Sequence, residues 1–254
     1  MQIVRFLSDL GIPTYGWVFE DKVGLIEGDP IGEYRRLEAL LPYRSLKILA
    51  PVSPSKVICI GRNYKAHADE HHVEVPNYPL IFLKPPSSII GPDQTVYLPS
   101  QSAHVEHEAE LAVVVGKPAS NISADDAVSY VFGYTIANDV TARDLQRLDG
   151  QWTRAKGFDT FCPIGPWIET EIDPYDLLIT CKVNGEVRQM GSTRDMVFHI
   201  GALIAYISSC MTLLPGDVIL TGTPAGVGIL NEGDVVNISI DGIGGLRSFV
   251  KKKP

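Results

Sequence analysis

Cysteine is scarce in this sequence, and its distribution excludes several common kinds of site. There are four cysteines in 254 residues, and no two form a Cys-x-x-Cys pair. That absence removes the usual motif of a zinc ribbon or a thioredoxin-like redox centre. Because Cys59, Cys162, Cys181 and Cys210 are scattered through apolar segments, we expect them to be reduced core residues of a cytoplasmic protein.

Long apolar runs and an excess of positive charge are also missing. The longest apolar region, 196–214, is interrupted by polar residues and predicts a buried helix, with His199 as a core residue inside it. The N-terminus lacks the charged-then-apolar layout of a signal peptide. With 22 Lys and Arg against 30 Asp and Glu, the net charge is −8. We therefore expect neither a membrane nor a nucleic-acid partner.

The common nucleotide and hydrolase motifs do not occur either. There is no Gly-x-Gly-x-x-Gly, no P-loop and no Gly-x-Ser-x-Gly nucleophile elbow. Residues 222–228 are rich in glycine but lack the Lys-Ser/Thr of a phosphate-binding loop. Two interpretations of this segment stay open: a turn that brings backbone amides and the Thr223 hydroxyl to a ligand, or a purely structural turn.

The first 50 residues have the pattern of a small separate unit. Residues 2–7 and 14–27 read as strands with a turn at 20–21, and 34–41 read as a helix that ends at Pro42. A unit of this size is too small to be stable unless it packs on the rest of the chain. With a joint at 51–54, we predict a small N-terminal domain over 1–50 and a larger domain over 51–254.

The larger domain alternates short strands with a few helices. We expect strands at 56–61, 79–84 and 132–139, and a hairpin that starts at 177–183 and turns at Asn184-Gly185. Residues 62–72 suit an exposed loop or a short surface helix, and helices should begin near Thr141 and near Thr193 or Asp195. The fold class is α+β and rich in β-structure.

An acidic stretch leads into an apolar strand at 104–116. On a strand, Glu106, Glu108 and Glu110 would project from one face, about 7 Å apart in sequence order. A hard divalent cation would offset such a row of charges, since Mg²⁺, Mn²⁺ and Ca²⁺ prefer oxygen ligands. A solvated edge strand is an equal alternative. Asp139 follows the strand at 132–139 and could join the site or cap the next helix.

Five blocks in this order resemble the fumarylacetoacetate hydrolase family, and together they cover roughly residues 51–250. They are 61–64 (Gly-Arg-Asn-Tyr) with His67 and Glu70, 108–111 (Glu-Ala-Glu-Leu), 138–146 (Asn-Asp-Val-Thr-Ala-Arg-Asp-Leu-Gln), 156–159 (Lys-Gly-Phe-Asp) and 222–228 (Gly-Thr-Pro-Ala-Gly-Val-Gly).

The resemblance implies a mixed β-roll catalytic domain that forms a homodimer and carries a small N-terminal domain. It implies Mg²⁺ or Mn²⁺, with Ca²⁺ possible, and a water-activating dyad on a segment that closes as a lid. By the same resemblance, the metal ligands are Glu108, Glu110 and Asp139, the catalytic residues are His67, Glu70 and Lys156, and the substrate-binding residues are Arg62, Tyr64, Gln146 and Thr223. The family often has other residues at Glu106 and His107. We expect His107 on the opposite strand face and Glu106 at most at the rim.

The activity implied first is hydrolysis of a carbon–carbon bond in an acylpyruvate, a 2-oxo acid with a second carbonyl. His67, oriented by Glu70, would deprotonate water, and Lys156 would stabilise the enolate. The alternatives are isomerisation of a hydroxymuconate-type diacid or decarboxylation or tautomerisation of an oxaloacetate-type acid in aromatic-compound degradation. A metal-binding relative without activity is a further alternative.

Overall fold

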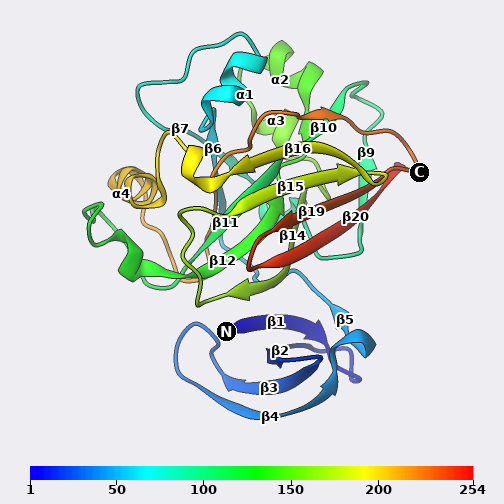
Figure 1. Cartoon of the computed structure of the whole chain (residues 1–254), viewed down its shortest axis with the longest axis vertical. Coiled ribbons are helices and arrows are strands. Elements are labelled where there is room, and N and C mark those ends of the chain that lie inside the picture. Colours follow the sequence, from blue (N-terminus) through cyan, green and yellow to red (C-terminus); the bar gives the residue numbers. More distant parts are fainter. Residues whose placement is uncertain (254) are drawn as a thin grey trace.

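Three β-sheets form the framework of the fold (Figure 1), and the computed structural model describes residues 1–253. The largest sheet runs in the order β4-β3-β2-β1-β14-β12-β11-β17-β6-β7, with β5 paired to β1 and β8 to β14. Its strands are β1 (Gln2–Leu7), β2 (Pro13–Phe19), β3 (Lys22–Gly28), β4 (Tyr34–Pro42), β5 (Lys47–Ile48), β6 (Val57–Gly61), β7 (Leu80–Lys84), β8 (Ile89–Ile90), β11 (Ala109–Val115), β12 (Val131–Asn138), β14 (Cys162–Glu169) and β17 (Val218–Leu220).

Two smaller sheets and four α-helices complete the fold. The helices are α1 (Lys65–Glu70), α2 (Arg143–Asp149), α3 (Thr153–Lys156) and α4 (Ile200–Cys210). The three-stranded sheet contains β10 (Val105–His107), β13 (Thr141–Ala142) and β18 (Gly228–Ile229). The five-stranded sheet contains β9 (Thr95–Leu98), β15 (Leu178–Val183), β16 (Glu186–Ser192), β19 (Val235–Ile240) and β20 (Gly244–Lys252).

Strand β11 lies in the centre of the large sheet, between β12 and β17, and all seven of its residues are buried. Alternate side chains enter two different cores: Leu111, Val113 and Val115 belong to one, and Ala112 and Val114 to the other. This two-sided burial is why the strand reads as a continuous apolar run. It also means that an acid at the start of the strand is carried into the interior.

The N-terminal unit, at the bottom of Figure 1, extends the large sheet by pairing β1 antiparallel to β14. The helix that we predicted over 34–41 is wrong, because these residues form β4, paired antiparallel to β3. Pairing at the sheet edge satisfies the backbone there, and the Trp17 indole donates a hydrogen bond of 2.8 Å to the Leu37 carbonyl. Tertiary context has outweighed the helix propensity of the segment.

Three predictions about residues 193–210 are also wrong, whereas the hairpin is confirmed. A 3₁₀ turn forms at 193–195 and α4 begins only at Ile200, so His199 is the exposed N-cap residue, its ring 5.5 Å from that of Tyr175. Cys210 is exposed, although the other three cysteines are buried as expected. The hairpin turns at Asn184 and Gly185, both with positive φ, as a tight type I′ turn requires.

None of the helices in residues 1–253 combines the length and the apolar character needed to cross a bilayer.

A buried aspartate anchors the parallel pair β17–β6 and allows a stability prediction. Asp217 is fully buried and accepts hydrogen bonds from the Ser55 hydroxyl at 2.6 Å and the Leu214 amide at 2.8 Å, and it pairs with the Lys56 ammonium. We expect Asp217→Ala to lower the free energy of unfolding by about 2–4 kcal/mol in urea titrations, because it leaves these donors unpaired.

The matched control is Glu27→Ala, which removes an exposed ion pair with Arg35. That change should stay within roughly 0.5 kcal/mol. An equal loss in both variants would contradict the structural role assigned to Asp217.

Candidate functional site

A cavity of about 170 Å³ is lined by residues of α1, α2 and α3. These helices lie at the end of the molecule far from the N-terminal unit (Figure 1). Its walls come from β6, α1, α2, α3 and the segment that joins β10 to β11. The wall includes four cationic side chains, Arg62, Arg143, Arg147 and Lys156, and two carboxylates, Glu108 and Glu110.

The acidic stretch is not one continuous strand, which corrects our expectation of three carboxylates on one face. Strand β10 ends at His107 and β11 begins at Ala109, and the two belong to different sheets. Glu108 lies at the break, where its amide donates to the Asn138 side-chain oxygen at 2.9 Å. Glu106 is consequently directed to Arg143 and His104, at 2.7 Å each, and not to the other two carboxylates.

Glu108, Glu110 and Asp139 instead converge from two separate segments. One oxygen from each lies within 4.8 Å of the others, and all three residues are at most 4% exposed. We refer to these three residues as the carboxylate cluster. Their burial excludes the solvated edge strand, and α2 has Ala142 as its N-cap, so Asp139 is not a helix cap.

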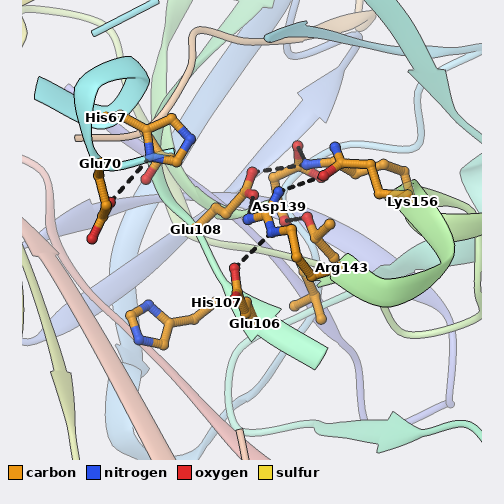
Figure 2. Close-up of polar contacts among 12 residues, drawn as sticks. His67, Glu70, Glu106, His107, Glu108, Asp139, Arg143 and Lys156 are labelled. Atoms are coloured by element: carbon orange, nitrogen blue, oxygen red, sulfur yellow. Dashed lines mark hydrogen bonds and ion pairs between the residues drawn. The ribbon is translucent and has the colours of Figure 1, made fainter. Parts of the chain in front are cut away.

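Three buried cations contact this cluster, and Figure 2 shows two of them, Lys156 and Arg143. The Lys156 ammonium donates to Glu108 at 2.8 Å and to Asp139 at 2.6 Å, and the Lys84 ammonium donates to the other Asp139 oxygen at 2.6 Å. Arg143 bridges Glu106 and Glu108. Burial alone would raise the pKa of Glu108, but Lys156 and then Arg143 outweigh it and bring that pKa well below its ordinary value.

Glu110 is the member of the cluster that has no ion pair within residues 1–253. Its carboxylate accepts a hydrogen bond of 2.6 Å from the Gly222 amide, and burial, followed by the charges of Asp139 and Glu108, raises its pKa well above the ordinary value. Such a carboxylate is stable in its charged form only beside another cation. The all-oxygen donor set fits a hard divalent ion of the Mg²⁺ or Mn²⁺ type.

The glycine-rich segment 222–228 approaches the cluster, where the Gly222 amide donates to Glu110. Gly222 has a φ of 96°, and an added Cβ would lie 2.7 Å from the Asn63 Cβ, so this position requires glycine. The Thr223 hydroxyl donates to the Ala109 carbonyl at 2.8 Å and accepts from the Gln189 amide at 2.7 Å. Thr223 still lines the cavity.

His67 lines the same cavity from α1, and Glu70 lies beside it on that helix (Figure 2). The short surface helix expected here is confirmed, since Lys65, Ala66, Asp69 and Glu70 are exposed, but its inner face buries His67, which is 7% exposed. Its Nδ1 is 3.5 Å from a carboxylate oxygen of Glu70, which also accepts from the Gly226 amide at 3.1 Å. Burial is the main cause that lowers the pKa of His67 below 6.5, so its imidazole is neutral near pH 7.

Of the predicted substrate-binding residues, Arg62, Gln146 and Thr223 line the cavity, and Tyr64 does not. Tyr64 is 2% exposed and borders a different groove, between α1 and the segment around Pro224. Gln146 accepts a hydrogen bond of 2.7 Å from Arg143 and is therefore already held by the charged network.

His107 is buried, and its ring points away from the carboxylate cluster (Figure 2). Its Nδ1 lies 2.9 Å from the Gln189 side-chain oxygen, which also accepts from the Ala109 amide at 3.0 Å. Gln189 thus ties the start of β11 to Thr223, and nothing in its local sequence indicated this role.

Lys84 and Arg143 were not among the site residues predicted from the sequence. Arg143 lies four residues after Asp139 within one of the five blocks, and this spacing could have drawn attention to it. Lys84 ends the apolar strand β7, where a lysine that is 1% exposed must have a buried partner.

Comparison with known proteins places this arrangement in context. Residues 56–251 match a family model described as fumarylacetoacetate (FAA) hydrolase C-terminal, and residues 1–51 match one described as Rv2993c-like, N-terminal. The human mitochondrial oxaloacetate tautomerase is 50% identical over 218 residues, covering 81% of this chain and 69% of its own.

Solved structures cover the full length. The crystal structure of 5-carboxymethyl-2-hydroxymuconate delta-isomerase from Mycobacterium smegmatis has a TM-score of 0.93 at 45% identity, covering 100% of both chains. A fumarylacetoacetate hydrolase from Exiguobacterium antarcticum has a TM-score of 0.90 at 36% identity, also over 100% of both chains. Relatives of this chain are thus named for isomerase, tautomerase and hydrolase activities.

Proposed function

The chain belongs to the fumarylacetoacetate hydrolase family, and from that premise we propose that it is a divalent-metal-dependent enzyme that interconverts the keto and enol forms of a short 2-oxo dicarboxylic acid of the oxaloacetate type. Membership confirms the resemblance found in the sequence, and the structural neighbours confirm the β-rich fold expected from it. The relatives of the chain are named as a tautomerase, an isomerase and a hydrolase, which catalyse different reactions.

A single arrangement carries this proposal: one small cavity is lined by Glu108 and Glu110 of the carboxylate cluster, by a neutral buried His67 and by two arginines without an ion pair in the described part of the chain. Arg62 and Arg147 are these arginines, and they suit the second carboxylate of a diacid. The volume of about 170 Å³ is below the roughly 300–1,000 Å³ of common ligand pockets, which favours a short substrate.

The residues of the chain divide the chemistry among them. Glu108, Glu110 and Asp139 would hold the cation, which when bound supplies a Lewis acid for a developing enolate. Lys156 contacts two of these acids and would add a second positive charge to stabilise the negative charge of that enolate. In the keto-to-enol direction His67 would accept the proton from carbon 3 and deliver it to the 2-oxo oxygen. In the reverse direction it would take the enol proton from that oxygen and return it to carbon 3, so that no atom is gained or lost.

Hydrolysis of an acylpyruvate is the second candidate, and one observation favours it. Glu70 is held by the Gly226 amide within 3.5 Å of His67 Nδ1. This is the placement of a carboxylate that orients a base toward water. A tautomerase has no need of that water.

The test is a substrate panel with Mg²⁺ or Mn²⁺ and with chelator. We expect the loss of the enol absorbance of oxaloacetate to be at least tenfold faster with metal-loaded enzyme than in buffer containing the same metal. Greater kcat/KM for pyruvate release from acetylpyruvate would establish the hydrolase instead. Rates equal to the buffer rate for both substrates, and for a hydroxymuconate analogue, would support a relative without activity and overturn the proposal.

A homodimer and a cytoplasmic location stay predictions. Size-exclusion chromatography with light scattering and fractionation of the source cells are the direct measurements of the two.

A further inference from the structure

A second group of ligand-type side chains lies on α1 and at its end, apart from the carboxylate cluster. His67, Glu70 and His71 each bring one ligand atom within 4.8 Å of the others. The two imidazole rings are 4.7 Å apart with an interplanar angle of 81°, and Figure 2 shows Glu70 directed toward His67. We refer to these three residues as the histidine cluster.

Two ring nitrogens in the histidine cluster have no hydrogen-bond partner. They are Nδ1 of His67 and Nε2 of His71. His67 is only 7% exposed. Leaving a buried polar atom unpaired costs about 1–3 kcal/mol. The Nδ1 of His67 is the atom that faces Glu70, at 3.5 Å, so the unpaired ring nitrogen is directed into the cluster.

The spacing of these residues is itself that of a metal-binding helix. Residues 67–71 read His-Ala-Asp-Glu-His, and histidines four apart on a helix bind one Zn²⁺ in H-E-x-x-H and H-x-x-E-H enzymes. In those enzymes the glutamate is the base, whereas here its carboxylate lies among the ligand atoms. We propose that His67, Glu70 and His71 form a second metal site, which takes Zn²⁺ or another imidazole-binding divalent ion.

The two clusters should sort ions by their ligands. Oxygen ligands alone suit Mg²⁺ and Mn²⁺, and imidazole nitrogen suits Zn²⁺, Ni²⁺ and Cu²⁺. An ion can reach the histidine cluster from solvent, since the Glu70 side chain is 34% exposed. Three protein ligands leave one position of a tetrahedral ion for water.

Zn²⁺ in this site would engage the imidazole that the proposed function uses as a base. We therefore expect Zn²⁺ to inhibit turnover supported by Mg²⁺. This consequence rests on the proposed function, whereas metal binding at the histidine cluster does not.

Binding is tested without substrate, using Co²⁺ as the probe on full-length protein saturated with Mg²⁺. We expect visible ligand-field bands typical of nitrogen-ligated Co²⁺, and at least tenfold weaker binding in His71→Ala. The matched control is His72→Ala, since His72 is the exposed next residue and lies outside the cluster. It should bind Co²⁺ as the wild type does.

Three results would overturn the site: unchanged Co²⁺ binding in His71→Ala, equal losses in the His71 and His72 variants, or a signal that disappears in Glu110→Gln but not in His71→Ala. The last would assign the ion to the carboxylate cluster. Calorimetric titration with Zn²⁺ on the same variants should reproduce the order of affinities.

Inhibition is measured separately, by comparing the Mg²⁺-supported turnover rate of each variant with and without Zn²⁺. Loss of inhibition in His71→Ala, with inhibition kept in His72→Ala, supports the regulatory consequence. Zn²⁺ binding without inhibition would leave the metal site standing and would overturn the role of His67 in the proposed function, so the two failures are distinguishable.

Discussion

Replacement of Glu110 by glutamine is expected to remove metal-dependent activity while leaving the metal-free protein folded. Outer partners of metal ligands are worth about 10–100-fold in affinity or activity, so loss of a ligand should cost at least 100-fold in kcat/KM. Glutamine keeps the shape of the side chain. Burial and the neighbouring carboxylates raise the pKa of Glu110, which favours its neutral form when no cation is bound, so the neutral amide is a close substitute.

The measurement separates folding from function. An ion that binds only the folded state raises the melting temperature, so Mn²⁺ should stabilise the wild type but not Glu110→Gln, and their metal-free melting temperatures should agree closely. Glu106→Gln is the matched control, because Glu106 lies on the same segment and outside the carboxylate cluster. A full Mn²⁺ shift in Glu110→Gln would remove this residue from the ligand set.

The convergence of Glu108, Glu110 and Asp139 could be predicted from the sequence, because these residues lie near strand ends and within blocks that resemble the family. Glu110 begins an apolar strand and Asp139 follows one, and the resemblance joined the two segments. The detailed geometry was not open to the same reasoning. A break at Glu108 moves β10 into a separate sheet and turns Glu106 toward Arg143, and no local pattern distinguishes a broken strand from a continuous one.

The cations around the cluster were harder to predict than the acids. Lys84 belongs to β7, the last strand in the order of the large sheet, and its ammonium contacts Asp139, which is 55 residues away in the sequence. Its position depends on sheet order, which follows from long-range pairing and not from local propensity. Strand β4 could not be predicted for the same reason. Residues 34–41 have the composition of a helix but form a strand because they pair with β3.

Because its charges are buried, we expect the site to be sensitive to single substitutions. Lys156, Lys84 and Arg143 are each at most 5% exposed, and each contacts the carboxylate cluster. Removing one member of such a network strands its partner in a medium that disfavours charge. Neutral substitutions of matching shape, such as glutamine for glutamate, therefore give cleaner tests than alanine.

His67→Ala is expected to lower kcat by about 10²–10⁴-fold, the usual contribution of a positioned general acid–base, whichever of the two reactions is catalysed. Mn²⁺ binding should be unchanged, because His67 is outside the carboxylate cluster. Glu70→Gln divides the candidates: a tautomerase should lose little, and a hydrolase that needs oriented water should lose much more. The measurements are steady-state kinetics on oxaloacetate and acetylpyruvate at saturating metal.

The dependence of kcat/KM on pH provides the control for this role. Burial lowers the pKa of His67 from 6.5, so its protonated form dominates only below that value. A base that must be neutral then produces a rate that is constant from pH 7 to 8 and falls as the pH decreases below about 6.5. The variant His72→Ala should show the same profile. A wild-type profile that falls already between pH 8 and 7, or a His67→Ala rate within threefold of the wild type, would remove His67 from the reaction.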